Sequence, residues 1–381
     1  MPLTRPHIHD LLVHYFSNKE LDELYLSFFL KSFALSMINL FIPIYLLTLG
    51  YSIADIALYF LINFSSAFIF MFPGMWCNSH FGIKKTMSLG IAFLVVFYYF
   101  VNQISGGLSY VPLAVLFGVS TGFYYAAFHV EFAKSACEKK EGEEVSILSA
   151  FAVLAGVLGP LIGSFFIASQ SFEFVFFVVA GILFLAILPL FFTPDKRMKK
   201  EVISIKSVLT AQPKKRMFIY QAEGVLNLVG GVFWPVFIYL AVKNVVTLGA
   251  IVSMTSLLLV VFIVYIGGLV DKNVKKTLKR GVFLNAPFWI IRLLFLSPVG
   301  LFINNFLGAV TSSMVNISLS KLIYGHAEKT KRIGSFFLFR ELHLGLGRVL
   351  ILVLALFIPG LLWMFVVAFL VQFVHLSAVN W

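Results

Sequence analysis

The chain has 381 residues, of which 60% are hydrophobic and 12% are charged, and its mean hydropathy is +0.96. So few charges in so long a chain exclude a water-soluble globular protein and indicate a polytopic membrane protein. The net charge of +12 does not indicate a nucleic-acid-binding protein, because the cations lie in short loops between apolar runs.

Apolar runs follow one another along the whole chain, and most reach the length of about 20 residues that crosses a bilayer. We expect an all-α integral membrane fold with about twelve spans. The predicted spans are 24–49, 53–76, 87–105, 110–133, 146–168, 173–192, 218–242, 247–270, 281–297, 300–321, 335–358 and 360–378. The longest polar stretch predicts a cytoplasmic linker, 194–217, between two six-helix bundles, 1–193 and 218–381.

The loops alternate in charge along the chain. One set is basic and contains Lys84, Lys85, Lys139, Lys140, Lys196, Arg197, Lys199, Lys200, Lys272, Lys275, Lys276, Lys329, Lys331 and Arg332. The opposite set has almost no cation, with Lys243 as the exception. Because basic loops face the cytoplasm, we expect both termini inside and the protein in the cell membrane. The histidines of residues 1–18 lack further ligands nearby, so we expect no metal or other cofactor.

A loop motif lies between the eighth and ninth predicted spans. From residue 267 to 276 the sequence reads Gly-Gly-Leu-Val-Asp-Lys-Asn-Val-Lys-Lys. The glycines would let two helices approach closely, and Asp271 could accept from free amides at a neighbouring helix N-terminus. This motif resembles the loop between the second and third helices of each half in major facilitator superfamily transporters. The matching positions are Gly267, Leu269, Asp271, Lys272, Lys275 and Lys276.

A second, weaker copy of the motif lies 192 residues earlier, where Ser79 stands at the position of Asp271. This copy includes Gly82, Lys84 and Lys85. The same offset relates Pro43 to Pro235 and Lys31 to Glu223. An offset that holds at separate landmarks indicates duplicated halves, which secondary transporters commonly have. Since Ser79 replaces the carboxylate, any latch in the first half should be weaker.

Charged residues inside spans cost about 2.5–3.5 kcal/mol each at mid-helix, so each needs a reason. The candidates are Lys31, Glu131, Glu223, Arg292, Arg340, Glu341 and Arg348. The family resemblance implies that the first, fourth, seventh and tenth helices line a central cavity. We therefore hypothesise that Lys31 and Glu223 pair across it and close the cytoplasmic side. The alternative is that Lys31 reaches the interface and Glu223 pairs with a neighbour.

Polar residues form stripes on three of the spans that the resemblance places at the cavity. The seventh span presents Glu223, Asn227 and Trp234 within about 40° of one another at 100° per residue. Comparable stripes are Asn305, Ser312, Asn316 and Ser320 on the tenth span and, more loosely, Thr121, Tyr125 and His129 on the fourth. These residues could bind a polar solute with an apolar or ring component, or form ordinary interhelical hydrogen bonds.

The remaining intramembrane charges call for structural partners. Arg348 lies too deep to reach water and needs a carboxylate or a substrate anion. Glu341 is seven residues earlier on the same face, and Glu131 is the other candidate partner. Arg292 lies near the outer end of the ninth span and is expected to reach the interface. Gln372 and His375 suggest no role.

The fifth span carries a glycine-proline motif, Gly156, Gly159, Pro160 and Gly163, which resembles a pattern often seen in the family's antiporters. Pro160 removes a helix hydrogen bond and should bend the span. The glycines should allow it to slide against a neighbouring helix.

The resemblance covers essentially the whole chain and implies a monomeric transporter that moves a small solute by alternating access within membrane lipid. No Gly-x-x-x-x-Gly-Lys-Ser/Thr motif occurs. A gradient, most simply of protons acting through Glu223, would then drive transport as symport or antiport, or transport would have no driving force. Three alternatives remain at this stage. They are a membrane enzyme, a lipid flippase on the same scaffold and a transporter-like sensor that does not transport.

Overall fold

The computed structural model describes residues 19–135, 141–197, 208–327 and 333–380, and these ranges are almost entirely helical. The histidines at positions 7, 9 and 14 lie outside them. The first half contains α2 (Lys19–Ile38), α3 (Ile42–Thr48), α4 (Ile53–His80), α5 (Ile83–Val101), η1 (Asn102–Ile104), α6 (Tyr110–Ser135), α7 (Glu141–Ser169), α8 (Phe172–Ile187) and η2 (Leu188–Phe191). The second half contains α10 (Lys215–Leu228), η3 (Val229–Phe233), α11 (Trp234–Val242), α12 (Val245–Lys272), α13 (Val274–Ile291), α14 (Pro298–Ala327), α15 (Ile333–Phe357), α16 (Leu362–Gln372) and η4 (Phe373–Asn380).

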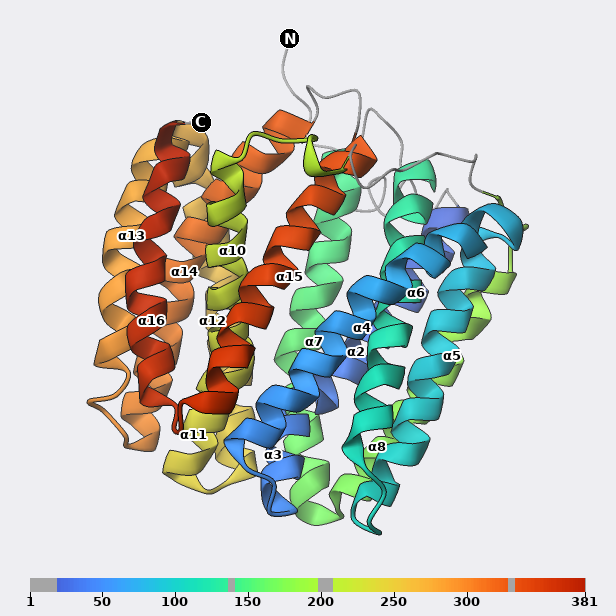
Figure 1. Ribbon diagram of the computed structural model, residues 1–381, viewed down its shortest axis with the longest axis horizontal. Coiled ribbons are helices and arrows are strands. Elements are labelled where there is room, and N and C mark those ends of the chain that lie inside the picture. The colour runs from blue at the N-terminus through green and yellow to red at the C-terminus, as the bar shows by residue number, and fades with distance from the viewer. Residues whose placement is uncertain (1–18, 136–140, 198–207, 328–332, 381) are drawn as a thin grey trace, which may run out of the picture.

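Ten helical segments within the described residues are long and apolar enough to cross a membrane. Two further long helices, α13 and α15, lie among them in the bundle (Figure 1). Both carry several charges, which lower their hydropathy: α13 begins with a run of cations that includes Lys275 and Lys276, and α15 contains Arg340, Glu341 and Arg348. The all-α membrane fold is therefore confirmed, while the count of twelve spans stays a prediction.

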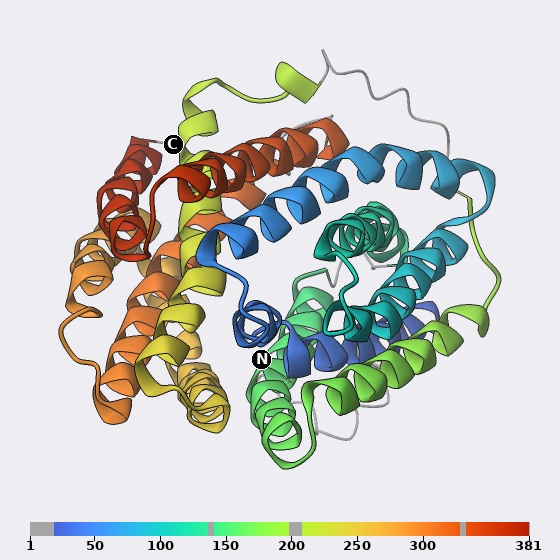
Figure 2. The ribbon, with the colours of Figure 1, turned by 60° about the horizontal axis from the view of Figure 1, so that its bottom comes forward.

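The helices form two groups, α2 to α8 and α10 to α16, which lie on opposite sides of the molecule in Figure 2. The groups meet mainly along two pairs of helices, α4 against α15 and α7 against α12. The second pair packs closely, because a Cβ at Gly249 of α12 would collide with the Ser164 side chain and the Pro160 carbonyl of α7. Each half thus contacts the other through few elements.

The two halves share an interruption at equivalent prolines. The first helix breaks at residues 39–41 before Pro43, and the seventh passes through a π-helical turn, Val229–Phe233, just before Pro235. Proline has no backbone N–H and its ring displaces the preceding carbonyl, so the regular hydrogen-bond ladder fails at both places. The matching breaks agree with the offset of 192 residues in the sequence.

The molecule has a basic end (top of Figure 1), which we define as the end where α4 joins α5 and α12 joins α13. Lys84 and Lys276 lie in the first turns of α5 and α13, Lys321 lies near the end of α14, and Lys196 pairs with Glu20 at the start of α2. The main hydrophobic core runs between the halves at the opposite end, where Phe41 and Ile44 belong to the same buried cluster as Val236 and Leu248. At the basic end the second half has a separate cluster that includes Tyr220 and Phe339. The halves therefore share one buried apolar cluster at the end opposite the basic end, whereas at the basic end Met71 and Met75 of α4 pack against the cluster of the second half.

Candidate functional site

The second half encloses a polar cavity of about 330 Å³ between α10, η3, α11, α13, α14 and the last helix. The polar and aromatic residues that line it are Glu223, Asn227, Trp234, Asn285, Trp289, Arg292, Asn305, Ser312, Asn316, Gln372 and His375. We call it the C-half cavity. A cavity among apolar helices on which several polar side chains converge is the default place to look for a small-molecule site.

Two of the predicted polar stripes meet in this cavity. Glu223, Asn227 and Trp234 line one wall, because the helical period places them on one face of the seventh span. Asn305, Ser312 and Asn316 of α14 line the facing wall, whereas Ser320 is not among the lining residues. A hydrogen bond of 2.8 Å from Trp234 Nε1 to Asn305 Oδ1 joins the walls.

Arg292 also lines the cavity, contrary to the expectation that it reaches the interface. Its side chain is only 5% exposed. The guanidinium carbon lies 4.8 Å from the ring centroid of Trp234 and 4.3 Å from that of Trp289. Two indole faces attract the cation electrostatically and replace water around it. The sequence shows only that Arg292 is near a helix end, and it does not show the rings.

The aromatic walls around Arg292 are themselves held by hydrogen bonds. Asn305 Nδ2 donates to Thr255 Oγ1 at 2.8 Å, and Trp289 Nε1 donates to Gln372 Oε1 at 3.4 Å. Asn285 Nδ2 donates to the Gly308 carbonyl at 3.1 Å. Sequence reasoning left out Asn285 and Trp289, and it assigned no role to Gln372. Their only signal was a polar or aromatic side chain in an otherwise apolar span.

The predicted pair of Lys31 and Glu223 does not form in the structure. Glu223 Oε1 instead accepts from Arg340 Nη2 at 2.6 Å, and Arg340 Nη1 also donates to Glu341 at 2.9 Å. Glu223 pairs with Arg340 because α10 packs against α15 within the same half. A Cβ at Gly347 of α15 would meet the Gln221 carbonyl of α10, which shows how closely the two helices approach.

Lys31 has aromatic rather than acidic neighbours. It is 6% exposed, so it does not reach the interface, and its Nζ lies 3.8 Å from the Tyr124 ring centroid and 5.2 Å from that of Tyr125. His129 lies on the same helix, α6, but its side chain is outside the part of the chain that the structure describes. Lys31 and Tyr125 do not line the C-half cavity.

Arg348 does not make the predicted ion pair with Glu341 or Glu131 among the described residues. Its guanidinium carbon lies 5.0 Å from the Phe64 ring centroid on α4, in the other half. Glu341 is engaged by Arg340. Glu131 is 1% exposed, and neither of its carboxylate oxygens has a hydrogen-bond partner within the described ranges. Arg348 and Glu341 therefore have different partners, and Glu131 has none within the described ranges.

The loop motif of the second half is exposed, and it differs from the expectation. Asp271 pairs with Lys321 Nζ at 2.6 Å instead of capping a helix. The start of α13 is capped locally, because Asn273 Oδ1 accepts from the backbone N–H of Lys276 at 2.9 Å. Within the described part of the chain, a Cβ added at Gly267 or Gly268 would have no neighbour within 4 Å, so these glycines do not mediate close packing. Lys272 and Lys275 are exposed at this end.

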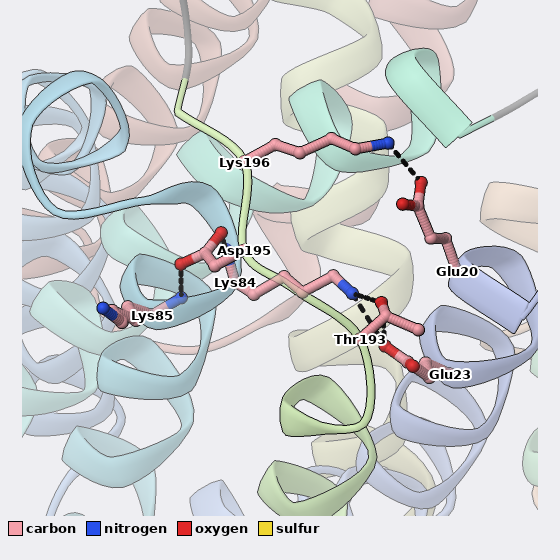
Figure 3. A network of polar contacts seen from close by, with 7 residues as sticks. All are labelled: Glu20, Glu23, Lys84, Lys85, Thr193, Asp195 and Lys196. Atoms are coloured by element: carbon pink, nitrogen blue, oxygen red, sulfur yellow. Dashed lines mark hydrogen bonds and ion pairs between the residues drawn. The ribbon is translucent and has the colours of Figure 1, made fainter.

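The corresponding loop of the first half has a stronger latch than its sequence indicates (Figure 3). Asp195, from the segment after η2, accepts from the backbone N–H groups of Lys84 and Lys85 at the start of α5. Lys84 Nζ forms a buried ion pair of 2.7 Å with Glu23 of α2 and also donates to Thr193. Asp195 thus supplies the carboxylate that Ser79 lacks, and a segment distant in sequence closes the loop.

The glycine-proline motif of α7 contacts two helices. Cβ atoms at Gly159 or Gly163 would collide with Ser36 or Met37 of α2, so these glycines permit close packing within the first half. Gly156 has no such neighbour. The Pro160 carbonyl faces Gly249 across the junction of the halves, which places this motif at the boundary between them.

Two helical bundles that share a duplicated pattern, with a cavity lined by polar side chains among the apolar helices of the second bundle, define an integral membrane protein of the transporter class. The chain belongs to the Major Facilitator Superfamily, whose family model matches residues 24–339.

Among curated proteins, it is 30% identical over 203 residues to the multidrug resistance protein MdtG of Proteus mirabilis (strain HI4320). The matched stretch spans 50% of this chain and 50% of that relative.

Solved structures of low sequence identity share the fold. A mutant of the nucleoside transporter NupG superposes with a TM-score of 0.71 at 12% identity, covering 95% of this chain and 99% of that one. A POT family transporter in complex with 5-aminolevulinic acid superposes with a TM-score of 0.70 at 12% identity, covering 94% of each chain. At this identity the likeness concerns the architecture alone.

Proposed function

We propose that this protein carries a small solute across the cell membrane by alternating access, with the C-half cavity as part of its solute site. The observation that carries the proposal is the convergence of polar stripes from α10 and α14 on one cavity between apolar helices. The halves meet mainly along α4–α15 and α7–α12. Such limited junctions support rocking of one bundle against the other around a fixed site.

A proton gradient is the proposed driving force, and Glu223 is the proposed proton carrier. Its Oε1 atom is held by Arg340, while its Oε2 atom is buried without a hydrogen-bond partner within the described ranges. Because Glu223 also lines the cavity, a proton that binds there competes with Arg340 for the carboxylate. Glu341, the second carboxylate on Arg340, does not line the cavity.

The test is solute flux in proteoliposomes with an imposed pH gradient. The panel includes drugs and nucleosides, which the names of the relatives suggest, together with amino acids and small organic acids. We expect at least one solute to accumulate in wild-type vesicles. E223Q should abolish accumulation yet retain exchange of labelled for unlabelled solute, whereas E341Q should keep accumulation. Absence of flux for every class overturns the proposal, and fluorescent-lipid movement in the same vesicles would favour the flippase alternative.

The proposal includes a membrane orientation. We infer that the basic end faces the cytoplasm with both termini on that side and that a single chain forms the transport unit, because basic loops are retained inside. Single cysteines at Lys196 and Lys243, in a background without native cysteines, provide the test. A membrane-impermeant thiol reagent added to intact cells should label the position-243 variant and spare the position-196 variant.

A further inference from the structure

We propose that the C-half cavity binds an organic monocarboxylate, with Arg292 as the residue that holds the carboxylate. The inference rests on the proposed transport site and names the class of solute that it takes. The positive charge of Arg292 has no acidic partner within the described residues. Arg292 is 5% exposed and makes no ion pair within the described residues, and its Nε and Nη1 atoms lack hydrogen-bond acceptors there.

The acidic residue of the same cavity does not neutralise Arg292. Glu223 is engaged with Arg340, which bridges it to Glu341 on the α15 side. Arg348 also interacts electrostatically with both carboxylates, so two arginines balance Glu223 and Glu341 and neither carboxylate pairs with Arg292. A buried cation whose donors are unsatisfied is costly, and the two indole faces supply attraction but no hydrogen-bond acceptor. The missing partner is an anion with oxygen acceptors.

The guanidinium is held in place before any anion binds. It lies between the Trp234 and Trp289 rings, and it fills the space beside Gly308, where a Cβ would collide with Nη2. The Gly308 carbonyl is occupied by Asn285, so it is not the acceptor that Arg292 needs. A rigid guanidinium loses little conformational entropy when it binds a planar carboxylate, which favours a specific site over a mobile surface arginine.

The walls of the cavity define the rest of the solute. Trp234 and Trp289 provide apolar faces next to the charge, and Asn227 and Asn316 add amide groups to the lining. A volume of about 330 Å³ accommodates a ring with a short acidic arm. The single uncompensated positive charge at Arg292 matches one carboxylate better than a dianion. The expected solute is therefore an aromatic or otherwise apolar monocarboxylate.

Three carboxylates and their uncharged amides test the proposal: benzoate and benzamide, 3-phenylpropionate and its amide, and indole-3-acetate and its amide. Binding is measured by isothermal titration calorimetry on the full chain in nanodiscs of phosphatidylcholine. We expect at least one acid to bind, and its amide to bind at least about 10-fold more weakly, since a hydrogen bond to a charged group is worth about 1.5–3 kcal/mol. Failure of all three acids to bind, or equal binding of acid and amide, overturns the assignment.

Three variants assign the effect to Arg292. R292Q should lose the preference for the acid, whereas R280Q, an exposed arginine on the same helix, should bind as wild type does. G308A keeps the charge but displaces the guanidinium, so it should also weaken acid binding, which covers the case in which R292Q does not fold. Wild-type affinity in folded R292Q, or in G308A if R292Q does not fold, overturns the assignment. If phosphatidylglycerol nanodiscs abolish acid binding, the anion is a lipid headgroup and the soluble carboxylate is wrong.

The proposed function and this inference fail in different ways. Flux of uncharged or cationic solutes without any binding of the acids would leave the transporter standing and remove the carboxylate assignment. Binding of an acid that depends on Arg292, without flux of any solute, would leave the carboxylate site standing and remove the proposed transport function.

Discussion

The carboxylate of Asp195 accepts a hydrogen bond of 2.9 Å from the backbone N–H of Lys84, although 111 residues separate the two in the sequence. A second bond of 3.0 Å comes from the backbone N–H of Lys85. The first amides of a helix have no partner within the helix, and a negative charge there is favoured by the helix dipole. The start of α5 is therefore capped by the segment that follows the last helix of the same half (Figure 3).

Removal of this cap should destabilise the protein. We expect D195A to lower the free energy of unfolding by about 1–2 kcal/mol, because the amides of Lys84 and Lys85 lose a charged acceptor. Thermal unfolding in detergent measures the effect. D271A is the matched control, since its partner Lys321 is 46% exposed and Asp271 itself is 78% exposed. The loss in D271A should stay below about 1 kcal/mol, and equal losses in the two variants would contradict the capping role.

Gly82 is required at this loop for two reasons. Its φ is +121°, which side chains rarely adopt, and a Cβ there would collide with the Asp195 carboxylate. We expect G82A to cost about 1–3 kcal/mol of stability, the range for a residue held in an unfavourable backbone conformation. G268A, which has open space around a Cβ at the corresponding loop of the second half, should change the melting temperature little. A neutral G82A would show that the loop relaxes without loss.

The fold could be predicted largely from the sequence, because local information determines it. Apolar run length predicts helices at membrane depth, and the helical period alone brings Glu223, Asn227 and Trp234 to one wall of the cavity. The offset of 192 residues relates Pro43 to Pro235, and the structure has a helix break before each of these prolines. Each of these inferences needs only residues that are near one another in the chain or repeated at a fixed interval.

The partners of the charged side chains could not be predicted in the same way. Sequence indicates the depth of Glu223 in the membrane, but Arg340 reaches it only because α10 packs on α15. Arg292 was assigned to the interface, since nothing near it in the sequence shows that two tryptophans enclose it. Asp195 replaces the carboxylate absent at Ser79 from a distant segment. Pairings of this kind depend on tertiary packing, which the local pattern leaves open.

The ion pair of Lys84 and Glu23 should show strong coupling. Their side chains are 2% and 5% exposed, and Nζ lies 2.7 Å from Oε2. Removing one partner leaves a buried charge uncompensated, so K84M or E23L alone should cost about 3–5 kcal/mol. The double variant K84M/E23L should lose much less than the sum of the single losses. Additive losses in this double-mutant cycle, measured by chemical unfolding, would show that the pair is not energetically coupled.

Cross-linking of Ser164 to Gly249 should stop transport. The two positions lie on α7 and α12 in different halves. Because a Cβ at position 249 would collide with the Ser164 side chain, the two helices must part slightly to admit the disulfide. Both positions lie toward the end where the apolar core joins the halves, so a disulfide there holds that end shut. In a chain without Cys77 and Cys137, we expect S164C/G249C to lose flux on oxidation and to regain it with a reductant.

The matched control for this experiment pairs Ser164 with a glycine of the second half that has no close neighbour. A Cβ at Gly268, which lies on the same helix as Gly249 and does not line the C-half cavity, would have nothing within 4 Å, so S164C/G268C should not cross-link, and oxidation should leave its flux unchanged. Because alternating access requires each end to open in turn, full flux in a completely cross-linked S164C/G249C protein would contradict the rocking of the halves. The fraction cross-linked is measured by the mobility of fragments after proteolysis between α7 and α12.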